Sequence, residues 1–358
     1  MPYAEIMTSL KVMPLEVSEH THQQKEMVVV GSVAQRGEDM PAKGAVTVFD
    51  IMDVVPDPDR PESGMKLQVF SREETKGAVT ALEAFLGGLI GTAQGLKIMI
   101  RGLKEDGSCL PVAFLDAQCQ ITSIKTLNRS GMWLAADAWK GLWFGGFTEE
   151  PYRLTPMGKS RTHMEILAAE FLPFDGQLFL VVIDAERDMH VLQYDPENPK
   201  SMAGQRLLHR STFHLGQFAT GMTLLPSLLK PFEEQGFTNG HTDDGSEAPA
   251  LRHILATFHS GAVGLVTPID EATYRRLSAL QAHLTSILEH AAGLNPRAYR
   301  AVESEGFGAR GVVDGSLVQR IGELGAARKA EVLGRAGGDA WGLRSDLEII
   351  GGGGLGYL

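Results

Sequence analysis

The sequence contains little that could form covalent or metal cross-links, because only Cys109 and Cys119 occur among its 358 residues. Two cysteines cannot form a disulfide framework or a four-cysteine zinc site, and such sparse use is typical of a reducing compartment. Long hydrophobic runs are also absent. The longest, residues 178–183, falls far short of the roughly 18 residues needed to cross a bilayer. We therefore expect no membrane partner.

Positive charge is in deficit, since 33 lysines and arginines face 44 aspartates and glutamates and give a formal net charge of -11. Strong binding to nucleic-acid phosphates depends on many lysine and arginine contacts. The balance therefore disfavours a chain whose main task is to neutralise phosphates, although it leaves a local basic patch open.

The chain is rich in glycine, with 41 residues, and in pairs of short apolar segments joined by a polar or glycine-bearing tip. Such pairs are typical of β-hairpins. About five copies occur, which is the kind of internal repetition that marks repeat architectures. The copies are residues 27–33 with 44–51, 88–93 with 96–100, 132–138 with 141–147, 177–194, and 253–267.

The spacing of the copies predicts the fold class. Leu89, Met132 and Leu178 open three successive copies at intervals of about 45 residues, which is near the period of a four-stranded propeller blade. A β-sandwich is the alternative, but it would repeat at a shorter interval. We expect an all-β propeller of the WD40-like kind. A propeller needs radial neighbours for every blade, so about five copies predict an incomplete seven-bladed propeller with missing blades.

The hydrophobic period changes after the last apolar strand. Thr267 can cap a helix, with Pro268 at its first position and Asp270 returning the bond. The helix that follows should end at Gly293, and Asn295 can cap the next one. Its apolar face would consist of Tyr274, Leu277, Leu280, Leu284, Ile287 and Leu288.

We expect a small helical carboxy-terminal domain from this point. The predicted division is a leading segment at 1–25, a partial propeller at 26–267 with a disordered loop at 228–250, the helical domain at 268–350, and a glycine-rich tail at 351–358.

No motif in the sequence predicts catalysis or a cofactor. Gly158, Lys159 and Ser160 resemble the end of a phosphate-binding loop, but Arg153 stands where that loop needs a glycine. Asp184, Glu186 and Asp188 alternate at a hairpin tip, where acidic residues are common without a metal. The histidines His190, His209, His214, His253 and His259 are spread over the repeats, and no spacing identifies a base and its partner. We predict no catalytic residue, no metal and no cofactor.

Arginines gather on or beside the expected helices, at positions 275, 276, 297, 300, 310 and 320. Two interpretations stay open: a solvated face paired with nearby glutamates, or a docking surface for an acidic partner or an RNA backbone. Arginine and tyrosine are the residue types that anchor protein interfaces. The candidate partner-binding residues are Tyr274, Arg275, Arg276, Arg297 and Tyr299.

Five segments resemble a known protein family: 77–85, 195–218, 260–267, 273–300 and 311–318. They are similar to the family of large subunits of the cleavage and polyadenylation specificity factor, in a fungal version. The large subunit of the UV-damaged-DNA-binding complex and the propeller subunit of splicing factor 3b are relatives within it. The matches are long and cover nearly the whole chain.

The resemblance implies three propellers and a helical carboxy-terminal domain, of which this chain would hold most of the third propeller and that domain. It also implies a nuclear, non-catalytic scaffold of pre-mRNA 3′-end cleavage and polyadenylation. Expected partners are the WD40 and zinc-finger subunits that read the polyadenylation signal and the endonuclease module. Nucleic-acid binding is implied too, although the acidic balance favours weak or indirect contact with pre-mRNA. Alternatives are a propeller subunit of a related DNA-repair or splicing complex, or a propeller hydrolase.

Overall fold

The structure is a computed structural model, and it describes residues 5–18, 21–55, 64–127, 130–226, 252–300 and 311–351. These residues form two compact units. The first unit comprises Met1–Ala169 and Pro196–Leu207, and the second comprises Glu170–Asp195 and Leu208–Leu358. The segment 228–250, expected to be a disordered loop, lies outside the described residues, as does the glycine-rich tail beyond Gly351.

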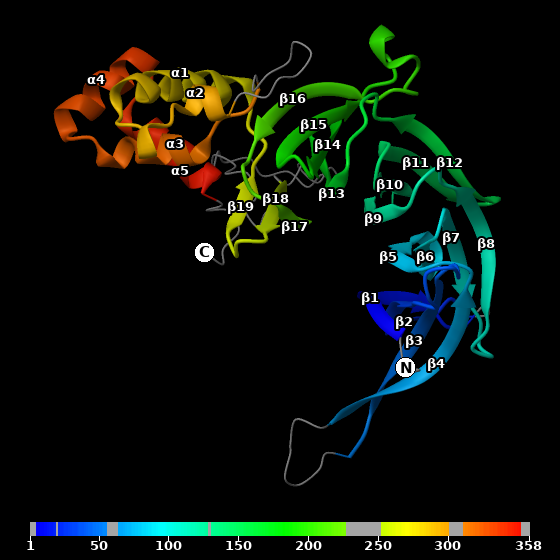
Figure 1. Cartoon of the computed structure of the whole chain (residues 1–358). Helices are drawn as coiled ribbons and strands as arrows, with labels where there is room; N and C mark the ends of the chain where they lie inside the picture. The colour runs from blue at the N-terminus through cyan, green and yellow to red at the C-terminus, as the bar shows by residue number, and fades with distance from the viewer. Residues whose placement is uncertain are drawn as a thin grey trace, which may run out of the picture. The chain divides into compact units, whose positions relative to one another are not determined.

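The first unit contains three antiparallel sheets of four strands each, and in every sheet the spatial order follows the chain (Figure 1). Each sheet is therefore a meander built from hairpins. The sheets are β1(Glu5–Glu16), β2(Gln24–Ala34), β3(Lys43–Asp53) and β4(Met65–Thr75); β5(Val79–Phe85), β6(Leu89–Gln94), β7(Lys97–Leu103) and β8(Cys109–Asp116); and β9(Ile121–Leu127), β10(Met132–Asp137), β11(Gly141–Glu149) and β12(Tyr152–Lys159).

Apolar side chains between successive sheets form the core of the first unit. One cluster joins the first two sheets and includes Met13, Val29 and Ile90. The next joins the second and third sheets through Trp133 and Phe147. The strands β1, β5 and β9 lie in sequence against one another, as the first strands of neighbouring propeller blades do.

A glycine allows the largest side chain of this core to fit. Gly145 on β11 pairs with Trp133 on β10, and a Cβ at Gly145 would collide with the indole ring. Only glycine leaves the space that the indole occupies.

The second unit contains two further sheets and the helices, except that the start of β13, residues 166–169, belongs to the first unit. The strands are β13(Ile166–Phe174), β14(Gln177–Asp184), β15(Asp188–Tyr194) and β16(Leu208–His214) in one sheet, and β17(Ala219–Pro226), β18(Arg252–Phe258) and β19(Val263–Val266) in the other. The helices follow β19 (Figure 1) and are α1(Glu271–Ile287), α2(Pro296–Tyr299), α3(Gly315–Gln319), α4(Ala326–Ala336) and α5(Ala340–Ile350). Short 3-10 turns η3(Ala291–Gly293) and η4(Arg320–Glu323) lie among them. Two other 3-10 turns, η1(Leu86–Gly88) and η2(Pro199–Ser201), belong to the first unit.

Five small antiparallel sheets followed by helices confirm the expected fold class, a β-propeller of five blades with a helical ending. The details differ at both ends. The first blade starts at Glu5, inside the segment expected to lead into the propeller, because β1 pairs with β2 from Glu5 to Glu16. The last sheet has three strands in the described residues rather than the four expected.

The expected start and end of the first long helix were wrong. Thr267 does not cap it, because its hydroxyl is hydrogen-bonded to Nδ1 of His253 at 3.0 Å. The helix begins after Asp270, whose backbone is extended, and ends at Ile287 rather than at Gly293. The next prediction was correct, since the Asn295 side chain accepts a hydrogen bond from the backbone N–H of Arg297 at the start of α2.

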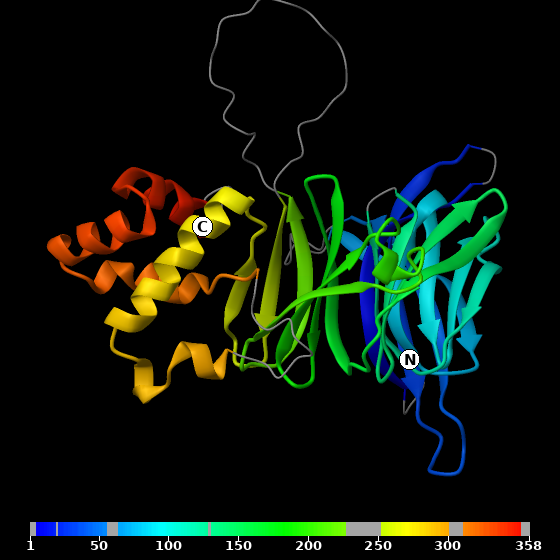
Figure 2. The same ribbon diagram turned by 90° about the horizontal axis from the view of Figure 1, so that it is seen from above.

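The helical part has its own apolar core. Leu277, Leu280, Leu284 and Leu288 are buried along one face of α1, and Leu317, Val318, Ile321 and Val332 from α3, η4 and α4 complete the cluster. In Figure 2, α1 lies along α3 and α4, in agreement with their contacts. Ile287, expected on the same face, is 38% exposed. Among the described residues, no helix is both long enough and apolar enough to span a bilayer.

Candidate partner-binding surface

The structure divides the five candidate residues into exposed and engaged side chains. Arg275 is 75% exposed, and within the described residues it pairs with Glu271, which lies one turn earlier on α1 and is equally exposed. An exposed pair of this kind contributes little to stability and leaves Arg275 accessible. Tyr274 is half-buried, and its hydroxyl accepts a hydrogen bond from the backbone N–H of Gly311 at 3.0 Å.

Arg276 connects two helices. Its Nη2 lies 2.9 Å from Oδ1 of Asp346 on α5, and its Nε lies 3.2 Å from Oδ2 of the same residue. Asp346 is buried, so this two-pronged pair is shielded from water on one side. The pair raises the pKa of Arg276, because the hydrogen bond to Asp346 stabilises the charged guanidinium. Arg276 therefore holds α5 on α1.

Arg297 and Tyr299 lie on the short helix α2, and both are exposed. The Arg297 guanidinium makes one long hydrogen bond, 3.4 Å, to the carbonyl oxygen of Ala282 on α1. The Tyr299 ring lies under the guanidinium of Arg300, whose Cζ is 4.9 Å from the ring centre. The two side chains are thus presented to solvent by a helix that Asn295 caps and Arg300 anchors.

Arg300 is the important residue that the sequence analysis did not select. Its Nη1 donates to the carbonyl oxygens of His214 at 2.6 Å and Leu215 at 3.2 Å, at the end of β16. Its Nε lies 3.1 Å from Oδ2 of the buried Asp314. The ring of Phe213 also packs against the guanidinium, with Cζ 4.8 Å from the ring centre. One side chain therefore joins the blade β13–β16 to the helices α2 and α3.

The blade β13–β16 also contains two pairs of a histidine with a carboxylate. Nε2 of His190 lies 2.8 Å from Oδ2 of Asp184, and Nδ1 of His214 lies 2.6 Å from Oδ1 of Asp188. His190 lies on β15, and His209 and His214 lie on the neighbouring strand β16. Three of the histidines that are dispersed in the sequence therefore belong to one blade. The β15–β16 register brings them together, since His190 lies opposite Thr212.

The order Asp184, His190, Thr212 resembles a carboxylate, base and hydroxyl set. Nδ1 of His190 is 3.3 Å from Oγ1 of Thr212, and that hydroxyl also lies 2.9 Å from Nε2 of His209. However, Thr212 is fully buried, so a substrate has no access to its oxygen. The geometry is that of a hydrogen-bonded network that satisfies buried polar groups within a blade.

The acidic group Asp184, Glu186 and Asp188 has ligand atoms within 4.8 Å of one another. Asp184 already accepts from His190 and from the backbone N–H of Asp188, and Asp188 accepts from His214. Asp184 and Asp188 therefore have protein partners, and the acidic group lies at the hairpin turn between β14 and β15, where acidic residues are common.

The network predicts a dependence of stability on pH through His209. Burial and the adjacent His190 lower the pKa of His209 to about 4, below its usual 6.5. Between these values the unfolded chain binds a proton that the folded chain does not, so stability falls as pH decreases from about 6.5 to about 4. Glutamine does not titrate, so His209→Gln should reduce this pH-dependent loss in the free energy of unfolding by about 1 kcal/mol. The effect is no larger because the side chain is partly exposed and its charge is screened.

Urea unfolding of the chain at several pH values measures this effect. His163→Gln, a matched substitution at an exposed position, should leave the pH profile unchanged. If the free energy of unfolding falls equally steeply with decreasing pH in His209→Gln and in the unaltered chain, His209 is not the source of the pH dependence.

Comparisons with known proteins agree with this architecture. The protein-family model described as "CPSF A subunit region" matches residues 1–323 of the chain. Protein cft1 of Aspergillus niger is 50% identical over 355 residues, which are 99% of this chain and 26% of the relative. Protein cft1 of Neurospora crassa is 43% identical over 93% of this chain and 23% of its own length, and the Schizosaccharomyces pombe protein is 34% identical over 96% and 23%.

The chain thus spans about a quarter of the length of the curated relatives it matches. Half the residues are identical to those of the Aspergillus niger protein, and the family match runs through all five blades and on to η4. These similarities confirm the resemblance seen in the sequence, and the chain belongs to the family of CPSF large subunits.

Proposed function

We propose that this chain is part of a non-catalytic scaffold subunit of the nuclear machinery for pre-mRNA 3′-end cleavage and polyadenylation. Family membership supports the assignment to this machinery. In this proposal the chain supplies the last propeller and the helical domain of a longer subunit. Its partners are the WD40 and zinc-finger subunits that read the polyadenylation signal, and through them the endonuclease module.

One observation supports docking most strongly: an exposed arginine and an exposed tyrosine lie on a short helix that is fixed to a blade. Arg297 and Tyr299 are exposed on α2, and Arg300 fixes that helix to the end of β16. Side chains held in place before binding lose less conformational entropy when a partner arrives. Arginine and tyrosine are also the residues enriched at interface anchors.

The five candidate residues then have two roles. Arg275, Arg297 and Tyr299 contact the partner, because their side chains are exposed. Tyr274 and Arg276 position the surface from within, through Gly311 and Asp346. Contact with pre-mRNA is indirect or weak in this account, since the net charge of -11 opposes strong binding to phosphates.

Capture from nuclear extract tests this proposal. The tagged chain should enrich the signal-reading subunits, identified by quantitative mass spectrometry. The double variant Arg297→Glu, Tyr299→Ala should capture at least about tenfold less, because anchor residues each contribute about 1–2 kcal/mol or more. Its melting temperature should stay unchanged, since both side chains are exposed.

The matched control is Arg36→Glu, which makes the same charge change at an exposed position of the first unit and should capture normally. If the folded double variant captures the signal-reading subunits as well as the unaltered chain does, these residues are not a docking surface. If the unaltered chain enriches no polyadenylation subunit, the proposed function is wrong.

A further inference from the structure

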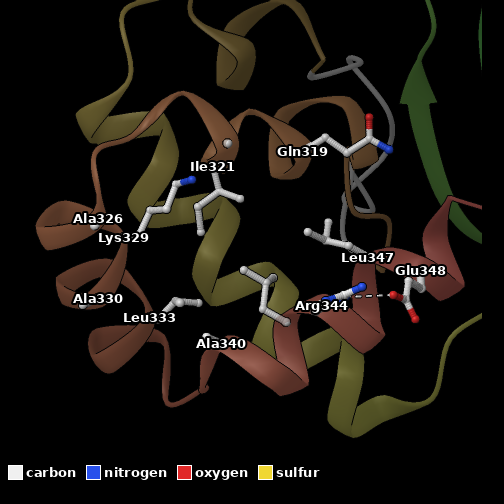
Figure 3. A pocket seen from close by; sticks show the side chains of 12 residues that line it. Gln319, Ile321, Ala326, Lys329, Ala330, Leu333, Ala340, Arg344, Leu347 and Glu348 are labelled. Carbon is white, nitrogen blue, oxygen red and sulfur yellow. Dashed lines mark hydrogen bonds and ion pairs between the residues drawn. The ribbon is translucent and has the colours of Figure 1, made fainter.

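An apolar groove lies between α4, α5 and η4, away from the surface on α1 and α2 discussed above. Its volume is about 610 Å³. Figure 3 shows side chains from both helices facing the same space. The walls are mostly apolar and comprise Ile321, Ala326, Ala330, Leu333, Ala340, Leu343 and Leu347.

The floor of this groove is continuous with the helical core. Leu333, Leu343 and Leu347 pack against the buried cluster of α1 and α3, yet each remains only partly buried. The core is therefore open to solvent along this side. Another apolar surface placed there would bury these side chains and complete the packing.

The charges at the rim are unequal. Arg344 is paired with Glu348 across one turn of α5, with Nε and Oε1 3.1 Å apart (Figure 3). On the opposite wall, Lys329 lines the groove beside Arg328, and within the described residues neither forms an ion pair. The α4 wall thus offers positive charge that no carboxylate of the described chain neutralises.

The shape favours a helix as the occupant. Both walls are helices of 11 residues, about 16 Å long, whose backbone groups are already paired internally. They offer no free strand edge to which an extended peptide could add. An amphipathic helix of about three turns instead places apolar residues at i, i+4 and i+7 along such a groove.

We propose that the groove between α4 and α5 binds an amphipathic helix of a partner protein, with an acidic residue on its flank paired to Lys329. The inference goes beyond the proposed function, because it uses neither α2 nor the exposed residues of α1. Most of the lining residues follow residue 323, where the match to the family region ends. The Aspergillus niger and Aspergillus clavatus relatives match over 99% and 100% of the chain, so the groove should be sought in them first.

A designed peptide tests the proposal on the full chain. The probe is a fluorescent 16-residue helix with leucines at i, i+4, i+7 and i+11 and glutamates along one flank. A second peptide carries lysine for each glutamate, and a third has the same composition in scrambled order. Fluorescence anisotropy should show binding of the acidic helix at least about tenfold tighter than of either control peptide.

Two variants connect binding to the groove. Ala330→Trp fills the space and should weaken the acidic peptide at least tenfold. Lys329→Glu, at a partly exposed site that leaves the core intact, should reverse the preference toward the lysine peptide. Arg335→Glu, on the same helix but outside the lining, should change neither affinity.

Other outcomes overturn the proposal. Failure of the acidic helix to bind, or equal binding of the acidic and basic helices, excludes an acidic helical partner. A large gain in affinity after removal of residues 352–358 would identify the chain's own end as the occupant. Concentration-dependent dimerisation in analytical ultracentrifugation, abolished by Ala330→Trp, would identify a second copy instead.

Discussion

Replacing Leu280 with aspartate should unfold the helical part of the second unit. Leu280 is buried in the centre of the α1 face, together with Leu277 and Leu284. The change removes an apolar side chain from a packed core and puts an unpaired carboxylate in its place. We expect a loss of about 5 kcal/mol or more in the free energy of unfolding, since cavity formation and charge burial both contribute.

Circular dichroism at helical wavelengths and limited proteolysis measure this loss, with cleavage expected first between α1 and α5. Ile287→Asp is the matched control, because Ile287 lies on the same helix but is 38% exposed. It should cost no more than about 1 kcal/mol. Similar losses for the two variants would mean that the α1 face is not the core of the helical part.

Replacing Arg300 with alanine should loosen the helices from the blade β13–β16. The substitution removes the hydrogen bonds to the carbonyl oxygens of His214 and Leu215 and leaves the buried Asp314 without its cation. Breaking a buried pair by removing one partner costs about 3–5 kcal/mol. Thermal unfolding should therefore begin at a lower temperature, and hydrogen exchange should become faster in α2 and α3.

Two further substitutions identify the cause. Arg300→Lys keeps the charge but lacks the planar fork, so an intermediate loss is expected. Arg297→Ala, at an exposed position three residues earlier, should change stability by no more than about 0.5 kcal/mol. An Arg300→Ala variant as stable as the unaltered chain would show that the bridge contributes nothing.

The sequence predicts the middle of each blade well and its edges poorly. The paired apolar segments correspond to β2–β3, β6–β7, β10–β11, β14–β15 and β18–β19. The first four pairs contain runs of buried side chains, whereas no residue of β19 is buried. Strand β4 is mostly exposed along its first half, and β1 alternates exposed and buried residues, so neither gives a strong apolar signal. For this reason the sequence alone predicts a propeller that begins at residue 26, after β1.

The helix boundary was misplaced for a different reason. Thr267, Pro268 and Asp270 have the residue types of a capping sequence, and local propensity favours that reading. In the folded chain, His253 takes the Thr267 hydroxyl, and His253 lies 14 residues earlier in the sequence. A tertiary contact therefore decides where the helix starts.

Long-range contacts also explain the limits of the site prediction. Asp346, the partner of Arg276, is 70 residues away, and the carbonyl oxygen of His214 is 86 residues from Arg300. The sequence shows that arginines are frequent in this region, but it does not show which of them are structural. Arg276 and Arg300 form long-range contacts that hold the helices in place. Arg275 and Arg297 are exposed to solvent. The pairing of His190 with Thr212 likewise depends on strand register.

Reconstituted 3′-end processing tests the central claim, a scaffold role, most directly. The full-length subunit would be prepared intact and without residues 271–350, and each form assembled with the other subunits on a pre-mRNA that carries a polyadenylation signal. The account predicts that the shortened subunit loses the signal-reading subunits and that both specific cleavage and polyadenylation stop. Normal complex composition and normal processing with the shortened subunit would contradict the proposed role of the helical domain as part of the scaffold.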